Sequence, residues 1–269
     1  MSARNLPDAT YARTRLGSGP GLVVAHGAGS SFANTYGPIL DGLAARHTVV
    51  GVDYPGSGDT PRATAPLSLD EMADQLVAAA VEEGLETFAL HGYSLGGPVA
   101  IRAAARHPER VSALVLTATF AYPNNQQALT IRVWRRLAAT GDRRLVSEFL
   151  FPHALSPQAL DAMSAEQLEQ VITYAAADIA DGTPEHAELA SRIDVRDDLA
   201  AIRVPTLVIS TTVDHLAPPA LHRHLAENIA DAQLAEIPTG HLPMVERPEE
   251  WQNLITGFLA KHESANRTM

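Results

Sequence analysis

Short, continuously apolar segments alternate with longer amphipathic segments along most of this chain. The apolar segments Gly21–Ala25 and Thr48–Asp53 lack the polar–apolar alternation of half-exposed strands, which is typical of strands buried on both faces of a sheet. The amphipathic segments between them predict helices that cover those faces. We therefore expect an α/β protein with a mostly parallel sheet flanked by helices. The segments predicted as strands are 21–25, 48–53, 87–91, 111–116, 206–210 and 233–237.

Three segments carry the clearest helical periodicity. The first begins after Ser68, which stands where an N-cap residue belongs and is followed three residues later by Glu71. A second helix is expected over Val99–Arg106, because a proline shortly afterwards stops it. The apolar stripe within Trp251–Leu259 predicts a closing helix.

The alternation stops between residues 123 and 199, where the sequence predicts helices and no clear strand. This segment is far longer than an ordinary crossover between neighbouring strands. We interpret residues 123–199 as an inserted helical cap, or lid, on a single core domain formed by residues 1–122 and 200–269. The helical stretches inside it are 129–137, 143–149, 165–176 and 185–191.

Composition narrows the chemistry that the chain can perform. It contains no cysteine, which excludes disulfides, thiolate metal sites, iron–sulfur clusters and a cysteine nucleophile. Lys261 is the only lysine, so a mechanism that uses a lysine as a covalent nucleophile is disfavoured. Twenty Lys and Arg against 31 Asp and Glu give a net charge of −11, which disfavours nucleic acid and anionic membranes as partners.

The remaining expectations concern location and partners. Residues 1–10 have no apolar leader, and the longest apolar runs are much shorter than a bilayer span. We therefore expect a cytoplasmic monomer or homodimer that acts on a small-molecule substrate, without a membrane partner. No cofactor and no metal are expected, since His222 and His224 have no third ligand nearby in the sequence.

The segment Leu90–Pro98 contains Gly-x-Ser-x-Gly at Gly92, Ser94 and Gly96, between a predicted strand and a predicted helix. In such a turn the serine hydroxyl projects from the end of the strand. Glycines on both sides remove Cβ atoms that would clash there. The following helix directs its positive N-terminal end toward the place where an oxyanion would form. The segment therefore predicts a nucleophilic serine.

From about Tyr11 to Ala260 the chain resembles the α/β-hydrolase superfamily in the order and setting of five motifs. The likeness is with its small single-domain serine esterases, haloperoxidase-like hydrolases and carbon–carbon bond hydrolases. It implies an α/β-hydrolase fold with the cap inserted between two strands. The motifs are His26-Gly27-Ala28-Gly29, Asp53-Tyr54-Pro55-Gly56-Ser57-Gly58, Gly92-Tyr93-Ser94-Leu95-Gly96-Gly97, Asp214 and Gly240-His241.

The resemblance implies a catalytic triad of Ser94, Asp214 and His241, in the chain order typical of the superfamily. His241 follows Gly240 after the last predicted strand, where members of the superfamily carry the base. Asp214 follows the predicted strand 206–210 and would hold the imidazole in the required tautomer. The competing position after the fourth predicted strand holds no carboxylate, which favours Asp214 further.

Two backbone N–H groups are expected to form the oxyanion hole. Leu95 directly follows the nucleophile and supplies one of them. Ala28, in the turn after the first predicted strand, supplies the other, with Gly29 as the alternative because the register of that turn is open. His26 in the same turn is expected to be structural. The residues expected to line a substrate pocket are Gly29, His91, Tyr93, Trp134, Phe149, Phe151 and Tyr174. The last four are aromatic residues of the cap, and packing of the cap on the core is an equally good explanation for them.

These residues predict a serine hydrolase that forms an acyl-enzyme with an ester, thioester or lactone of a small to medium apolar molecule. A serine at position 94 disfavours the epoxide hydrolase and haloalkane dehalogenase branches, whose nucleophile is an aspartate. Three alternatives stay open. They are hydrolysis of a carbon–carbon bond in a β-diketone-like substrate, acyl transfer by a cyclase in a biosynthetic pathway, and ligand binding by a receptor with minimal turnover.

Overall fold

A seven-stranded sheet runs through the computed structural model of the protein, which describes residues 6–266. The strands lie in the order β1-β3-β2-β4-β5-β6-β7, and every neighbouring pair is parallel except β1 and β3. The predicted mostly parallel sheet is therefore confirmed. The strands are β1 Arg13–Leu16, β2 Gly21–Ala25, β3 Thr48–Val52, β4 Phe88–Tyr93, β5 Val111–Thr117, β6 Thr206–Thr211 and β7 Ala232–Ile237.

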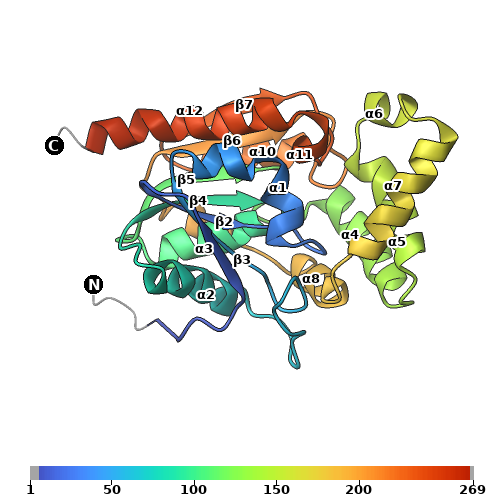
Figure 1. Cartoon of the computed structure of the whole chain (residues 1–269), viewed down its shortest axis with the longest axis horizontal. Helices are drawn as coiled ribbons and strands as arrows, with labels where there is room; N and C mark the ends of the chain where they lie inside the picture. Colours follow the sequence, from blue (N-terminus) through green and yellow to red (C-terminus); the bar gives the residue numbers. More distant parts are fainter. Residues whose placement is uncertain (1–5, 267–269) are drawn as a thin grey trace.

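Helices cover both faces of the sheet and form a further group beside it (Figure 1). α1 and α12 pack on one face, whereas α2, α3 and α10 pack on the other. α4 to α7 gather on the side of the molecule opposite the chain termini. The helices are α1 Phe32–Ala44, α2 Leu69–Glu82, α3 Gly96–Arg106, α4 Asn125–Ala138, α5 Arg143–Ala154, α6 Pro157–Asp161, α7 Ala165–Asp178, α8 Thr183–Ala190, α9 Arg196–Leu199, α10 Pro219–Asn228, α11 Pro243–Glu246 and α12 Pro248–Asn266.

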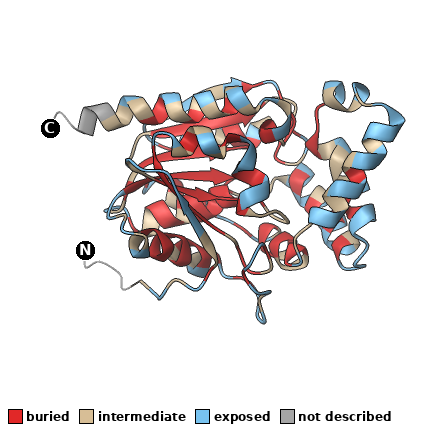
Figure 2. Ribbon diagram, in the orientation of Figure 1, coloured by how far each residue is buried: buried red, intermediate tan, exposed pale blue. Residues whose placement is uncertain are grey.

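The central strands are buried on both faces, as Figure 2 shows. Leu22 and Val24 of β2 belong to the core layer under α1 and α12. Val23 and Ala25 of the same strand belong to the layer under α2, α3 and α10. Because successive side chains point to opposite faces, a strand buried on both sides needs an apolar residue at every position.

Some elements follow the sequence pattern closely and others escape it. The Ser68 hydroxyl accepts a hydrogen bond from the Glu71 N–H, so the predicted start of α2 is confirmed. α1 is not predicted by the pattern, and it contains Pro38, a residue that normally interrupts a helix. β1 is also not predicted, because its residues are polar and mostly exposed at the sheet edge.

Six helices, α4 to α9, and no strand lie in the described chain between β5 and β6. α5 packs on α7, and α4 packs on α8. An apolar cluster of Trp134, Ala138, Val146 and Ala187 joins them and contacts Ala28, just beyond the end of β2. This helical segment therefore rests on a loop at the carboxyl edge of the sheet.

The lengths and hydropathy of the helices bear on the prediction that the protein has no membrane partner. Within residues 6–266, no helix is both long enough and apolar enough to cross a bilayer. Residues 1–5 and 267–269 lie outside the described chain. The first of these ranges is half of the segment 1–10, for which no apolar leader is predicted, and the second belongs to the predicted core domain.

Candidate active site

Loops from four strands meet at the carboxyl edge of the sheet. Ser94 follows β4, Asp214 follows β6, His241 follows β7, and the turn 26–29 follows β2. Because parallel strands end at the same edge, residues far apart in the chain come together there.

Ser94 occupies a strained turn between β4 and α3. Its φ of +52° lies in the left-handed region, which costs a residue with a side chain about 1–2 kcal/mol. A Cβ atom on Gly96 would collide with the Ala25 carbonyl oxygen, so only glycine allows β2 and the turn to approach so closely. Thr119 Oγ1 donates a hydrogen bond of 2.6 Å to the Ser94 carbonyl oxygen and braces the turn.

The side chains of Ser94, His241 and Asp214 form a continuous hydrogen-bonded chain. Ser94 Oγ lies 2.9 Å from Nε2 of His241, and His241 Nδ1 lies 2.7 Å from Oδ2 of Asp214. His241 and Asp214 are buried, with exposed fractions of 6% and 2%. The structure thus brings together all three residues that the sequence places in one site.

The hydrogen bonds of Asp214 determine which nitrogen of His241 carries its proton. Oδ1 accepts from the N–H groups of Leu216 and Ala217, and Oδ2 accepts from Thr211 Oγ1 at 2.8 Å. An ionised carboxylate only accepts hydrogen bonds, so His241 Nδ1 is the donor between the two side chains. The lone pair of Nε2 then faces the Ser94 hydroxyl, an arrangement that allows the imidazole to accept the serine proton.

The backbone N–H groups of the two turns beside Ser94 differ in whether the described residues offer them an acceptor. The Gly29 N–H donates a hydrogen bond of 3.1 Å to Nδ1 of His186. Within the described residues, the N–H groups of Ala28 and Leu95 donate to no protein acceptor. Leu95 stands at the N-terminus of α3, where the helix dipole favours negative charge. The N–H groups of Ala28 and Leu95 thus remain available to a bound molecule, whereas that of Gly29 is already occupied.

The loop of His241 is fastened on two sides. The Tyr93 hydroxyl donates 2.8 Å to the His241 carbonyl oxygen, and the rings of the two residues lie 5.3 Å apart. The His241 N–H donates 2.6 Å to the carbonyl oxygen of Ala154, at the end of α5. The helical segment between β5 and β6 therefore helps to position the imidazole.

Glu246 adds a third fastening, which supports a stability prediction. Its Oε1 accepts hydrogen bonds from the N–H groups of Gly240 at 3.0 Å and Ser156 at 3.1 Å. Glu246→Ala leaves both donors without this acceptor, so we expect a loss of about 1–3 kcal/mol in the free energy of unfolding, measured with urea. Glu246→Gln retains an Oε1 acceptor and should lose less than about 1 kcal/mol. Equal losses in the two variants would contradict this role.

His91 is wrongly predicted as a pocket residue, and Tyr93 has a different role. His91 is completely buried, and its ring packs between Tyr36 and Trp251 in the layer under α1 and α12. A side chain with no exposed surface there offers nothing to a substrate. Tyr93 is also buried and is used in holding His241, as described above.

The aromatic residues of the helical segment divide into two groups. Tyr174 is 71% exposed on α7, so its prediction as a pocket wall is wrong. Trp134 is buried, and a Cβ atom on Gly29 would lie 3.6 Å from its ring. Phe149 is half-buried and packs on the same cluster as Trp134. Phe151 is half-buried on the same helix as Phe149.

Four buried histidines around the site are held in the neutral form. Burial lowers the pKa of His26 and of His91 to about 3. Burial likewise lowers the pKa of His186 and of His222 to about 4. His26 has the structural role expected of it, because its Nε2 accepts the Tyr54 N–H at 3.1 Å.

These lowered pKa values predict acid sensitivity of the fold. In the unfolded chain a histidine binds its proton near pH 6.5, whereas the buried ones do so only near pH 3–4. Their contribution to stability is therefore complete above about pH 6.5 and is lost as the pH falls toward 4, by up to about 1.4 kcal/mol per pH unit for each histidine. Urea unfolding of His91→Gln at pH 7 and pH 5 should show a weaker pH dependence than the unaltered protein. The exposed His215→Gln variant is the control, and an unchanged slope in His91→Gln would contradict the prediction.

The structure also reveals functional candidates that the sequence did not indicate. Thr211 contacts Asp214, Glu246 contacts the His241 loop, and His186 contacts the turn after β2. Glu246 lies six residues after Gly240, so proximity in the chain was a weak signal for it. His186 lies 157 residues from Gly29, and no spacing or motif points to their contact.

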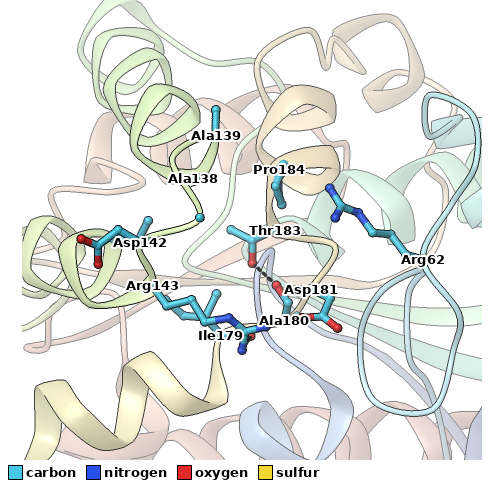
Figure 3. Close-up of a pocket in the computed structure, with 12 residues that line it drawn as sticks. Arg62, Ala138, Ala139, Asp142, Arg143, Ile179, Ala180, Asp181, Thr183 and Pro184 are labelled. Atoms are coloured by element: carbon cyan, nitrogen blue, oxygen red, sulfur yellow. Dashed lines mark hydrogen bonds and ion pairs between the residues drawn. The ribbon is translucent and has the colours of Figure 1, made fainter.

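A cavity of about 350 Å³ lies between α5, the α7–α8 connection and the loop that carries Arg62 (Figure 3). Ala180 and Thr183 line it, and Thr183 Oγ1 donates 2.6 Å to the Ala180 carbonyl oxygen. Ser94 and the residues bonded to it do not line this cavity. Thr183 also lies against Gly29, and it therefore connects the cavity wall to the turn after β2.

Comparison with known proteins places this geometry in a family. The profile of the alpha/beta hydrolase fold matches residues 20–248. The chain is 34% identical, over 98% of its own length and 99% of the relative's, to a pyrrolizixenacetamide deacetylase of Xenorhabdus hominickii. It is 29% identical, over 91% of its length and 97% of the relative's, to a pimeloyl-[acyl-carrier protein] methyl ester esterase of Aeromonas hydrophila. A thermophilic esterase of Thermogutta terrifontis superposes with a TM-score of 0.80, 26% identity and 93% coverage of both chains. The protein belongs to the α/β-hydrolase family of enzymes.

Proposed function

We propose that the protein is a serine hydrolase that forms an acyl-enzyme at Ser94 with an ester, thioester or lactone of a small to medium apolar molecule. The observation that carries this proposal is the hydrogen-bonded chain from Ser94 through His241 to Asp214. The N–H groups of Ala28 and Leu95, which have no acceptor among residues 6–266, support it. A nucleophile, its base and donors for a developing negative charge are the groups that acyl transfer requires.

The chemistry follows from the positions of these groups. Ser94 Oγ attacks the acyl carbon while its proton passes to Nε2 of His241. Asp214 stabilises the imidazolium that results, and the carbonyl oxygen becomes an oxyanion that accepts from Ala28 and Leu95. His241 then gives the proton to the leaving oxygen or sulfur, and the acyl group stays on Ser94. Water repeats the same steps, releases the acid and restores the serine.

We assign the helical segment 123–199 the role of a cap that supplies part of the substrate site. Its apolar cluster of Trp134, Ala138, Val146 and Ala187 contacts Ala28, the proposed oxyanion donor, so that a bound acyl group would lie beside apolar surface. Trp134 belongs to this cluster and Phe149 packs against it. Tyr174 and His91 take no part.

Hydrolysis of an acetamide is a second candidate function. The relative from Xenorhabdus hominickii is a deacetylase whose name specifies an acetamide, and its match spans 98% of this chain. An amide uses the same acyl-enzyme route, with His241 protonating a leaving amine instead of an oxygen. The two candidates differ only in the leaving group.

A fluorophosphonate probe and a substrate series test the proposal together. We expect the probe to label Ser94 covalently and an acyl-chain series of aryl esters and thioesters to be hydrolysed, with an aryl acetamide compared at equal acyl length. A β-diketone assayed by product analysis separates carbon–carbon bond hydrolysis from ester hydrolysis. A folded protein that is neither labelled nor active on any acyl compound would overturn the proposal, as would tight ligand binding with negligible product release.

A further inference from the structure

We propose that His186 of α8 is a positioning residue for the oxyanion turn: it holds Gly29 so that the preceding N–H, that of Ala28, is aimed at the acyl oxygen. This inference rests on the proposed function, because an oxyanion turn has meaning only in acyl transfer. His186 lies in the helical segment and not in the core that carries Ser94.

The helical segment occupies both backbone polar groups of Gly29. The Gly29 N–H donates 3.1 Å to His186 Nδ1, and the Gly29 carbonyl oxygen accepts from the Ala180 N–H at 3.1 Å. Gly29 itself has a φ of +70°, a conformation that fixes the direction of the peptide groups on either side. The helical segment thus holds the oxyanion turn at Gly29. This residue directly follows Ala28, whose N–H has no acceptor among the described residues.

The imidazole of His186 fits this role in only one protonation state. Its Nε2 lies 3.0 Å from the Pro55 carbonyl oxygen, and a carbonyl oxygen only accepts, so Nε2 carries the hydrogen. The lone pair of Nδ1 is then free to accept the Gly29 N–H. Protonation of Nδ1 would remove that acceptor. The ring is completely buried, and burial lowers its pKa to about 4, which keeps it neutral at neutral pH.

Neighbouring contacts hold His186 itself in place. The Gly182 N–H donates 2.9 Å to the Gly56 carbonyl oxygen, which ties the start of α8 to the loop after β3. Arg62 of that loop forms an ion pair with Glu185 at 2.8 Å. The rings of Tyr54 and His26 lie 6.1 Å and 6.5 Å from the His186 ring. The ring therefore connects three segments: the oxyanion turn, the loop after β3 and the helical segment.

Two amide variants separate positioning from simple packing. In His186→Asn the side-chain oxygen can occupy the place of Nδ1 and still accept the Gly29 N–H. In His186→Gln the amide nitrogen can occupy the place of Nε2 and still donate to Pro55, but the acceptor for Gly29 is lost. Asn is one methylene smaller than Gln and leaves the larger cavity at this buried position, so a pure packing defect would affect the Asn variant more.

We expect His186→Gln to lower kcat for an aryl ester by about 10- to 100-fold and His186→Asn to lower it by less than about fivefold. KM should change less than about threefold in both, because the lost interaction belongs to the transition state. The inhibition constant of a trifluoromethyl ketone, whose adduct with Ser94 carries an oxyanion, should rise with the loss in kcat. Rates are expressed per active site titrated with the fluorophosphonate. His47→Gln, a buried histidine bonded to Glu263 away from the site, is the control and should keep its kcat.

Backbone NMR of the unaltered protein tests the same point without any substitution. Formation of the trifluoromethyl ketone adduct should shift the amide protons of Ala28 and Leu95 downfield and leave that of Gly29 nearly unchanged. A shift of the Gly29 amide instead of Ala28 would overturn the proposal, as would equal kcat values in the Asn and Gln variants. A wild-type protein without ester turnover or labelling would overturn the proposed function and this inference with it, so the two failures are distinguishable.

Discussion

Replacing Ser94 by alanine is expected to lower kcat for an aryl ester by about 10⁴-fold or more. The variant lacks the oxygen that forms the acyl-enzyme, while the hydrogen-bonded pair of His241 and Asp214 remains. Steady-state hydrolysis and fluorophosphonate labelling measure the loss. Residual activity within about tenfold of the unaltered protein would show that another group performs the reaction.

The matched control is a buried serine elsewhere in the chain. Ser147 lies inside α5, is 2% exposed, and donates 3.1 Å to the Arg143 carbonyl oxygen. Ser147→Ala loses one hydrogen bond worth about 0.5–1.5 kcal/mol of stability and should keep its kcat within about twofold. A large fall in its kcat would mean that general destabilisation, and not loss of the nucleophile, explains the result for Ser94.

Glycine at position 94 tests the strain of the turn separately from the chemistry. Ser94→Gly and Ser94→Ala both lack the hydroxyl, so neither should turn over substrate. They differ in the Cβ atom, which is unfavourable at the φ of +52° that this residue adopts. We expect the glycine variant to be more stable than the alanine variant by about 1 kcal/mol in urea unfolding. A less stable glycine variant would contradict the left-handed conformation.

Asp214→Asn is expected to lower kcat by about 10⁴-fold while the protein stays folded. The amide oxygen can still accept from Leu216 and Ala217, which places the amide nitrogen toward His241. A nitrogen that donates forces His241 Nδ1 to accept, so the ring hydrogen moves to Nε2. That nitrogen then cannot take the proton of Ser94.

Thr211→Val is a milder change at the same carboxylate and is compared with Asp214→Asn. It removes one donor from Asp214 Oδ2 and leaves the carboxylate and its other three hydrogen bonds in place. We expect a fall in kcat of about tenfold or less, because the imidazole keeps its tautomer. Comparable losses in Thr211→Val and Asp214→Asn would show that the tautomer of His241 is not what Asp214 supplies.

Much of the fold could be predicted from local sequence. Segments of apolar residues without alternation predict strands buried on both faces, and this describes β2 to β6. The sequence also predicts β7, although most residues of that strand are not buried. The edge strand β1 was not predicted, because its polar residues resemble a loop when only one of its sides is paired. α1 was not predicted either, since Pro38 interrupts its helical pattern. Its N-cap residue Ser31 accepts a hydrogen bond from the Asn34 N–H, and a glutamate at position 34 would have made the start of the helix easier to recognise.

The assignments that failed share a physical cause. His91 and Tyr93 both lie on β4 beside Ser94, yet a strand sends successive side chains to opposite faces, and only packing decides what each face meets. Tyr174 lies on α7, whose pattern shows apolar residues but does not show which side another helix will cover. Aromatic residues in such a segment therefore indicate burial less reliably than those in the core.

The resemblance to the α/β-hydrolase superfamily indicated Asp214 and His241 at the ends of two later strands. Local sequence by itself determined six of the seven strands, the helices α2, α3 and α12, and the Gly-x-Ser-x-Gly turn. Each of these depends on neighbours a few residues away, which a linear pattern records. Only the tertiary structure decided that Gly29 donates to His186, that Ala28 is left free, and that Glu246 joins the His241 loop to Ser156. These contacts depend on where the helical segment comes to rest against the sheet edge. No local preference encodes that position, because it results from burial summed over many distant side chains.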